Sequence, residues 1–204
     1  MLSAIAYVLA AFARVPVVLF LRYDPKDVII AIGGFIYGPM AAFMITVVVS
    51  LIQMFTVSGT GIWGLMMNII ASSAFCCTAA YFYKKNRTMK GAVQGLIAGF
   101  FVATTAMMLW NYLVAPIYMG VSREEVARLL LPAFLPFNLI KNGLNAAITI
   151  LLYKHIKTIL NISTLLPSQS DQRQPARLNV GIILVALFVL ASCVLWVLVL
   201  QGII

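Results

Sequence analysis

Four polar residues in the second half of the chain have a spacing that places them on one helical face. Asn138, Lys141, Asn142 and Asn145 stand at positions i, i+3, i+4 and i+7 of an otherwise apolar segment, and these positions line one side of an α-helix. In a membrane, a charged side chain at the bilayer centre costs about 2.5 to 3.5 kcal/mol. We therefore expect this polar stripe to face a polar cavity, where amide and ammonium groups can bind the carbonyls and ring nitrogens of a flat heterocycle.

The stripe also has a simpler structural explanation. Amide side chains hydrogen-bond between membrane helices, and a lysine can extend its ammonium group to the headgroups. Any one of the amides fits this explanation at least as well as ligand binding. Four polar residues on one face, however, exceed what contact between helices requires, so the stripe as a whole favours a binding site.

A second group of candidate binding residues ends the preceding apolar segment. Asn111 and Tyr112 follow Trp110 there, and Tyr118 and Phe137 lie close by in the sequence. Aromatic rings of this kind can stack on a flat ligand. Each ring taken alone fits an aromatic belt at the membrane surface better than a ligand contact.

The remaining reactive residue types do not form a catalytic or metal-binding pattern. His155 is the only histidine and is flanked by basic residues, while all three cysteines lie inside apolar segments. There is no phosphate-binding Gly-x-x-x-x-Gly-Lys-Ser/Thr motif. We predict no catalytic residue, no metal site and no bound cofactor, and hence no enzyme.

Asp24 and Asp27 need a separate explanation. They alternate with Arg22 and Lys26 in a polar stretch between two apolar segments. Exposed charges in such a stretch pair with one another, so we expect ion pairs within a loop. The apolar spans then contain no carboxylate near their middle, which argues against proton-coupled transport.

The elements that must position these residues are membrane helices. Hydrophobic residues make up 63% of the chain and charged residues 9%, against roughly 25% charged residues in a typical soluble domain. The net charge of +9 comes from short basic clusters at the ends of apolar runs, which indicates membrane topology and no nucleic-acid partner. Seven apolar segments are expected to cross the membrane: residues 2–21, 28–37, 40–57, 62–83, 90–114, 132–152 and 178–200.

Two local patterns refine this assignment. Gly91, Gly95 and Gly99 are spaced by four residues, which lets another helix approach closely. Ser122 followed by Glu125 is a capping box, so a short amphipathic helix over residues 126–131 is expected along the membrane surface.

The distribution of basic residues predicts the orientation. Eight bases and one acid lie in the loops around residues 84–90, 154–157 and 171–177, whereas bases and acids balance on the other side. The base-rich side is expected to be cytoplasmic. This places the N-terminus inside the cell, and the loops at 22–27, 58–61 and 115–131 outside.

Several short motifs occur in an order that resembles a known family. They are residues 21–28, residues 34–39, the turn 59–61 followed by Asn68, the pair 111–112 with residues 116–118, and residues 136–141. Over residues 1–158 the chain resembles the riboflavin-specific S components, RibU type, of energy-coupling-factor (ECF) vitamin importers. The combination is specific, although each motif alone is common.

The resemblance implies a fold and a set of partners. It implies an all-α integral membrane protein with the six-helix S-component bundle in residues 1–160. Riboflavin would be the transported ligand, and a membrane T subunit and two cytoplasmic ATPases would be the partners. Residues 161–177 are then a polar cytoplasmic linker, and residues 178–204 contain an additional C-terminal transmembrane helix for which the family offers no role.

The resemblance also implies roles for individual residues. Asn111, Asn138 and Lys141 match positions that hold the isoalloxazine ring, and Tyr112 joins them. The turn formed by Gly59, Thr60 and Gly61, together with the first external loop containing Tyr23, is expected to close over the ligand. Ala6 and Ala10 match the Ala-x-x-x-Ala pattern with which family members contact the T subunit.

Two other functional classes remain open from the residues alone. A stand-alone secondary permease for another small metabolite or vitamin would work without the ATPases. An integral membrane enzyme would need a catalytic dyad or metal cluster at one depth in the membrane, and the sequence contains neither.

Overall fold

The computed structural model describes residues 1–12, 15–18, 21–56, 61–162 and 180–200, so most of the predicted linker lies outside the described residues. A π-helical turn, η1, directly precedes α7. The elements in chain order are α1 (Leu2–Phe12), β1 (Val15–Val18), β2 (Leu21–Tyr23), α2 (Lys26–Tyr37), α3 (Pro39–Thr56), α4 (Gly61–Lys85), α5 (Met89–Met119), α6 (Arg123–Leu129), η1 (Leu130–Phe134), α7 (Leu135–Ile162) and α8 (Val180–Leu200).

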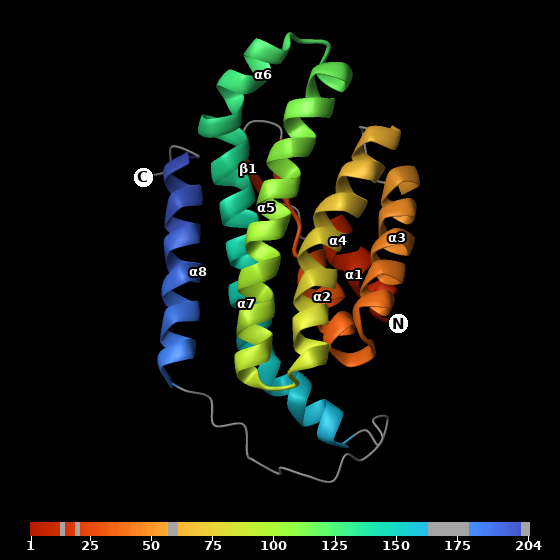
Figure 1. The fold of residues 1–204 in the computed structure, drawn as a ribbon, viewed down its shortest axis with the longest axis vertical. Coiled ribbons are helices and arrows are strands. Elements are labelled where there is room, and N and C mark those ends of the chain that lie inside the picture. Colours follow the sequence, from red (N-terminus) through yellow and green to blue (C-terminus); the bar gives the residue numbers. More distant parts are fainter. Residues whose placement is uncertain (13–14, 19–20, 57–60, 163–179, 201–204) are drawn as a thin grey trace.

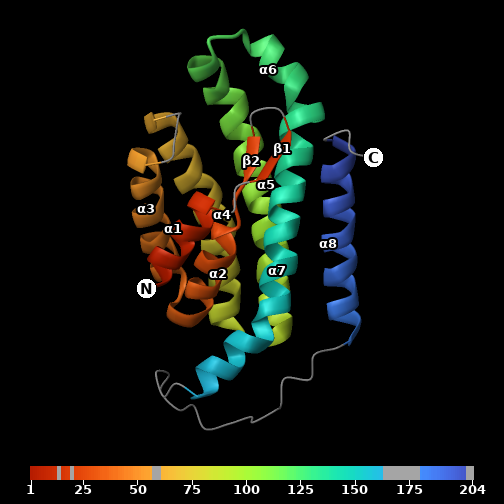
Figure 2. The same cartoon turned by 180° about the vertical axis from the view of Figure 1, so that it is seen from behind.

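The long helices stand side by side in a bundle (Figure 1). α8 lies at one edge against α7, and α3 lies at the opposite edge, as the reverse view also shows (Figure 2). Four stretches are long and apolar enough to cross a membrane: Pro39–Thr56, Gly61–Lys85, Met89–Met119 and Arg123–Tyr153. Leu2–Phe12 and Ile183–Val199 are shorter apolar helices. The prediction of a helical membrane protein is therefore confirmed.

Residues 2–21 do not form the single membrane span that the sequence predicts. α1 ends at Phe12, and the chain then forms a two-stranded antiparallel hairpin in which Val15 pairs with Tyr23. β-branched valines favour strands, and Pro16 lacks the N–H group that a helix interior requires. The hairpin therefore interrupts an otherwise helical fold.

α2 is too short to span a membrane alone. Its 12 residues are about 18 Å long at 1.5 Å per residue, whereas the hydrocarbon core is about 30 Å thick. The chain descends from the hairpin into α2, which begins inside the molecule and continues toward the end where α4 terminates (Figure 1). The predicted short crossing at residues 28–37 is thus a half-length helix whose first turn lies in the interior.

α4 and α5 pack closely because glycines face the contact. A Cβ atom added to Gly95 would lie 2.5 Å from the Ala79 carbonyl oxygen, and one added to Gly99 would lie 2.6 Å from the Phe75 carbonyl oxygen. No side chain fits at those distances. The close approach predicted from the four-residue glycine spacing is confirmed.

The start of α7 is set by α6 and η1. The predicted capping box is present, since the Ser122 hydroxyl accepts from the Glu125 N–H and the Glu125 carboxylate accepts from the Ser122 N–H. Pro136 removes one backbone donor from the following turn, and the Leu135 N–H bonds to the Leu130 carbonyl in a π-type turn. This wider turn directly precedes the helix that carries the polar stripe.

Candidate ligand-binding site

The polar stripe on α7 faces the protein interior, as its spacing predicts. Its four side chains are almost completely buried, with exposures of 3% for Asn138, 9% for Lys141, 3% for Asn142 and 0% for Asn145. Asn138 donates to the Phe134 carbonyl at 2.8 Å, and Asn142 donates to the Thr104 hydroxyl on α5 at 3.0 Å. Two members of the stripe are therefore held by ordinary structural hydrogen bonds.

The other two members of the stripe meet at Asp27, in the first turn of α2. The Lys141 ammonium lies 3.3 Å from the Asp27 carboxylate. Asn145 donates to the same carboxylate at 3.2 Å and accepts from the Tyr23 hydroxyl at 3.0 Å. Ser72 on α4 donates to the second carboxylate oxygen of Asp27. One buried carboxylate thus joins α2, α4 and α7.

The expectation of loop ion pairs for Asp24 and Asp27 is wrong for Asp27. Its exposure is 1%, and its charged partner is Lys141, more than a hundred residues away in the sequence. The physical reason is that α2 starts inside the bundle, so its polar first turn is buried. Asp24 pairs with Lys26 at 3.6 Å as expected, but this pair is buried as well, with exposures of 8% and 0%.

Lys26 forms a second buried polar cluster next to the first. Its ammonium donates to the side-chain amide oxygen of Gln53 at 2.6 Å and to that of Asn68 at 2.9 Å. Lys26 and Gln53 both have an exposure of 0%. The two buried clusters together contain two cations, Lys26 and Lys141, and two anions, Asp24 and Asp27. Burial of charged groups is tolerated here because each charge is paired with an opposite one.

Several buried polar atoms near these elements have no hydrogen-bond partner among the described residues. Among them are Oδ1 of Asp24, Nε2 of Gln53, Nε1 of Trp110 and Oδ1 of Asn111. Native proteins leave few such atoms, and each calls for an explanation, such as a functional role or a bound water or ion. These four atoms comprise two acceptors and two donors.

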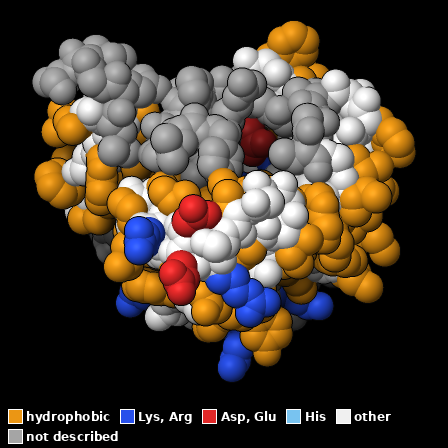
Figure 3. Space-filling view, turned by 90° about the horizontal axis from the view of Figure 1, so that it is seen from above, with side chains coloured by type: hydrophobic (Ala, Val, Ile, Leu, Met, Phe, Trp, Pro, Cys, Tyr) orange, Lys and Arg blue, Asp and Glu red, His pale blue; other side chains and the backbone are white. Residues whose placement is uncertain are grey.

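Figure 3 shows the end of the molecule that carries α6, where an acidic side chain is visible below the surface. The described acids are either exposed on α6, as Glu124 and Glu125 are, or buried, as Asp24 and Asp27 are. Polar groups therefore lie below this face within an apolar bundle, an arrangement typical of small-molecule sites.

The structure brings together only part of the predicted site. Asn111 is buried at 2% exposure, whereas its neighbour Tyr112 is 41% exposed and takes no part in the buried network. Gly61 begins α4 with a φ of +54°, a left-handed conformation suited to glycine. Gly59 and Thr60 lie outside the described residues.

The predicted partner-binding alanines face the chain's own core. Ala6 and Ala10 both have an exposure of 0%, and Ala6 packs in the cluster that includes Ile30 and Phe75. The exposed face of α1 instead carries Ile5, Val8 and Phe12. In this conformation the alanine pair serves the packing of α1 within the bundle.

The sequence interpretation missed Asp27, Lys26 and Gln53 as members of the interior site. Gln53 is the one amide in the apolar segment 40–57, and an isolated amide in a membrane helix needs a partner. That signal was available. The pairing of Asp27 with Lys141 had no local signal, because it depends on where α2 meets α7.

Comparison with known proteins identifies the family. Residues 1–153 match the family model described as "ECF transporter, substrate-specific component". The chain is 31% identical to riboflavin transporter RibU of Staphylococcus aureus over 78% of this chain and 88% of the relative. It is 29% identical to riboflavin transporter FmnP of Bacillus subtilis, over 77% and 88% respectively.

A solved structure agrees with this result. The structure titled "Structure and mechanism of the S component of a bacterial ECF transporter" superimposes with a TM-score of 0.66 and 32% sequence identity, covering 78% of this chain and 93% of that chain. The matched protein is a non-enzymatic transport subunit, in agreement with the predicted lack of enzymatic activity. The chain belongs to the family of substrate-specific S components of ECF transporters.

Proposed function

We propose that this chain captures riboflavin from the α6 end of the bundle, which we assign to the extracellular side. The observation that carries the proposal is the set of polar side chains buried between α2, α4, α5 and α7, including the unpaired acceptor of Asn111. The relatives named riboflavin transporters support the identity of the ligand. Other flavins that share the ring are the nearest alternatives.

The chemistry of the ring system fits these groups. The pyrimidine edge of isoalloxazine carries two carbonyl acceptors on either side of an imide N–H donor. Asn111 offers an unpaired acceptor, and the Lys141 ammonium has three donors, of which the described residues engage one, with Asp27. Asn138 stands one helical turn before Lys141 and could present its amide to the same edge.

The ribityl chain needs a different environment, with donors and acceptors for hydroxyl groups. Asp24 and Gln53 provide an unpaired acceptor and an unpaired donor, both buried. We place the ribityl chain near the Lys26 cluster. Two segments would then cover the ligand: the turn at residues 59–61, and the first external loop, which contains Tyr23.

Import would depend on partners. An S component of this family would work with a membrane T subunit and two ATPases, and we propose the same assembly for this chain. Residues 1–160 would form the binding domain, residues 161–177 a cytoplasmic linker and residues 178–204 a further transmembrane segment. Because Ala6 and Ala10 are buried, contact with the T subunit would use the exposed face of α1 or require α1 to shift.

Equilibrium binding tests the ligand assignment. Purified full-length protein in detergent should quench riboflavin fluorescence in a saturable titration. Lumiflavin, which has the isoalloxazine ring with a methyl group in place of the ribityl chain, separates ring recognition from recognition of the ribityl group. No saturable quenching at micromolar riboflavin would rule out the flavin assignment.

Uptake by cells tests the coupling. A host without its own riboflavin uptake should import riboflavin when it produces this chain with the T subunit and both ATPases, and should not import it with this chain alone. Uptake with the chain alone would favour the stand-alone permease.

A further inference from the structure

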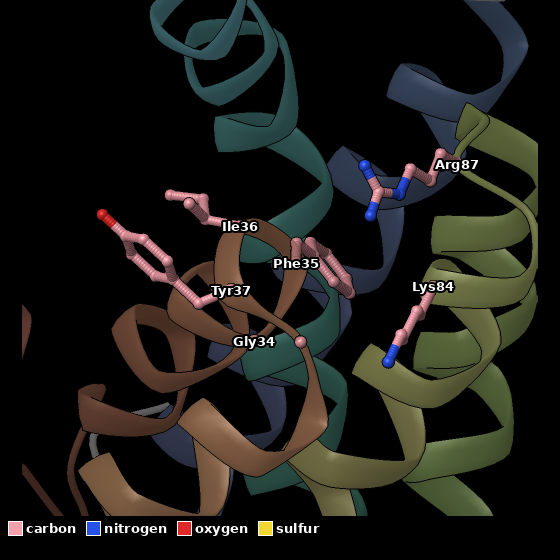
Figure 4. A pocket seen from close by; sticks show the side chains of 7 residues that line it. Gly34, Phe35, Ile36, Tyr37, Lys84 and Arg87 are labelled. Carbon is pink, nitrogen blue, oxygen red and sulfur yellow. The ribbon is translucent and has the colours of Figure 1, made fainter. Parts of the chain in front are cut away.

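A cavity lies at the base-rich end of the bundle, away from the polar stripe. It has a volume of about 250 Å³ and lies between the end of α2 and the end of α4. Its lining comprises Gly34, Phe35, Ile36, Tyr37, Gly38, Lys84 and Arg87. Both basic side chains extend from the α4 side toward α2 (Figure 4).

The backbone of α2 shapes this cavity. A Cβ atom on Gly34 would lie 2.9 Å from that of Ala80 and 3.0 Å from that of Ala42, so glycine lets α2 settle against its neighbours. Gly38 then turns the chain into α3 with a φ of +96°. A Cβ atom on Gly38 would meet nothing within 4 Å, so the cavity is open beside this residue. Phe35, with 6% exposure, provides an apolar floor.

The charge in the cavity is unbalanced. Lys84 and Arg87 line it together, and no acidic residue does. Among the residues that the structure describes, the ion pairs are those of Lys26 with Asp24 and of Lys141 with Asp27, and neither involves the cavity. Two cations that face one space repel each other, and an anion placed between them relieves that repulsion.

The chemistry and position of the cavity select a phosphate group. A guanidinium binds phosphate oxygens in a two-pronged geometry, and an ammonium adds a point charge. A single water occupies about 30 Å³, so the cavity admits a group of several heavy atoms. Tyr37 of the lining is exposed, as is Met40 two residues after Gly38 in the sequence, and exposed apolar side chains at that level suit acyl chains.

We propose that this cavity binds the phosphate group of an anionic phospholipid, a phosphatidylglycerol-type headgroup, in the inner leaflet. Basic pockets between membrane helices on the cytoplasmic side are suited to such headgroups. The assignment to the inner leaflet uses the proposed orientation. It does not require the ligand captured at the other end to be riboflavin.

Lipid binding by the full-length protein tests this site. Protein purified in neutral detergent would be titrated with short-chain phosphatidylglycerol, short-chain phosphatidylcholine or inorganic phosphate, and followed by native mass spectrometry. Phosphatidylglycerol should bind in a saturable manner and phosphatidylcholine should not. Binding of inorganic phosphate without phosphatidylglycerol would overturn the lipid assignment, and binding of neither would overturn the site.

Charge-matched variants localise the effect. Lys84→Gln with Arg87→Gln should weaken phosphatidylglycerol binding roughly tenfold or more, because each change removes a charge-assisted hydrogen bond to the phosphate within the cavity, and one such bond contributes about a factor of ten. Lys85→Gln with Lys90→Gln removes the same charge from exposed positions outside the cavity lining and should leave binding near that of the wild type. Equal losses in the two variants would show a general charge effect and overturn the proposal. Thermal unfolding in detergent, measured on the same samples, reports whether each variant is folded.

Discussion

Asp27 is the residue on which the interior site depends. It is buried, it belongs to the first turn of α2, and it contacts side chains from α4 and α7. A buried ion pair is weak evidence for stability, but removing one partner leaves an uncompensated charge. Asp27 and Lys141 should therefore behave as a unit in mutational experiments.

Replacing Asp27 alone should destabilise the protein. Asp27→Asn leaves the Lys141 ammonium without its carboxylate, and losing one member of a buried pair costs about 3 to 5 kcal/mol. Thermal unfolding in detergent should show a lower midpoint for Asp27→Asn. The double variant with Lys141→Gln should recover part of the loss, because no charge is then left unpaired. The pairing would be contradicted if the double variant lost more stability than the two single variants lose together.

Replacing Lys141 should weaken riboflavin binding. Lys141→Ala removes a donor that we place at the pyrimidine edge, and a buried partner left without its hydrogen bond costs about 1 to 3 kcal/mol. Fluorescence quenching measures the change. Lys90→Ala, at an exposed lysine at the base-rich end, is the matched control and should bind as the wild type does. Unchanged affinity of Lys141→Ala in folded protein would move the binding site elsewhere.

At the scale of elements, α8 is the part of the fold without a counterpart in the family match, which ends at residue 153. It packs on α7, and Leu190, Cys193 and Val197 join the hydrophobic cluster that contains Tyr23 and Phe137. A Cβ atom added to Gly143 would lie 3.3 Å from the Cys193 sulfur. Gly143 lies between Asn142 and Asn145 in the sequence, so α8 packs close behind the polar stripe.

A larger side chain at residue 143 should disturb this packing. Gly143→Val inserts atoms where Cys193 already lies, and overpacking of this kind costs about 1 to 3 kcal/mol. The unfolding midpoint should fall, and Cys193→Ala in the same chain should restore part of it. Gly181→Val is the matched control, because a Cβ atom there meets nothing within 4 Å. Equal effects at the two glycines would show that α8 does not pack on α7 as described.

At the scale of the whole molecule, the two ends of the bundle carry different chemistry. The end that carries α6 has an acidic side chain below its surface (Figure 3), and the other end has the cavity lined by Lys84 and Arg87 (Figure 4). The proposed orientation puts the first end outside the cell and the second end inside. A transport subunit placed in this way meets its ligand on one side and its energy source on the other.

Labelling of single cysteines tests the orientation. In a chain whose three native cysteines are replaced by serine or alanine, Glu124→Cys on α6 and Lys90→Cys at the start of α5 report opposite ends, and both positions are exposed. A membrane-impermeant thiol reagent applied to intact cells should label Glu124→Cys alone. Both should react after the membrane is opened. Labelling of Lys90→Cys alone in intact cells would reverse the assignment.

The sequence by itself determined the helical membrane fold, the close contact of α4 with α5, the capping box before α6 and the inward polar face of α7. Each follows from hydropathy, glycine spacing or helical periodicity, which act within about one or two turns. Only the tertiary structure showed the hairpin after α1, the buried alanines of α1 and the position of Asp27. Whether a charge at the start of a short helix is exposed depends on the depth at which that helix begins. Packing against α4 and α7 sets that depth. Because these helices are distant from α2 in the sequence, no local pattern could encode it.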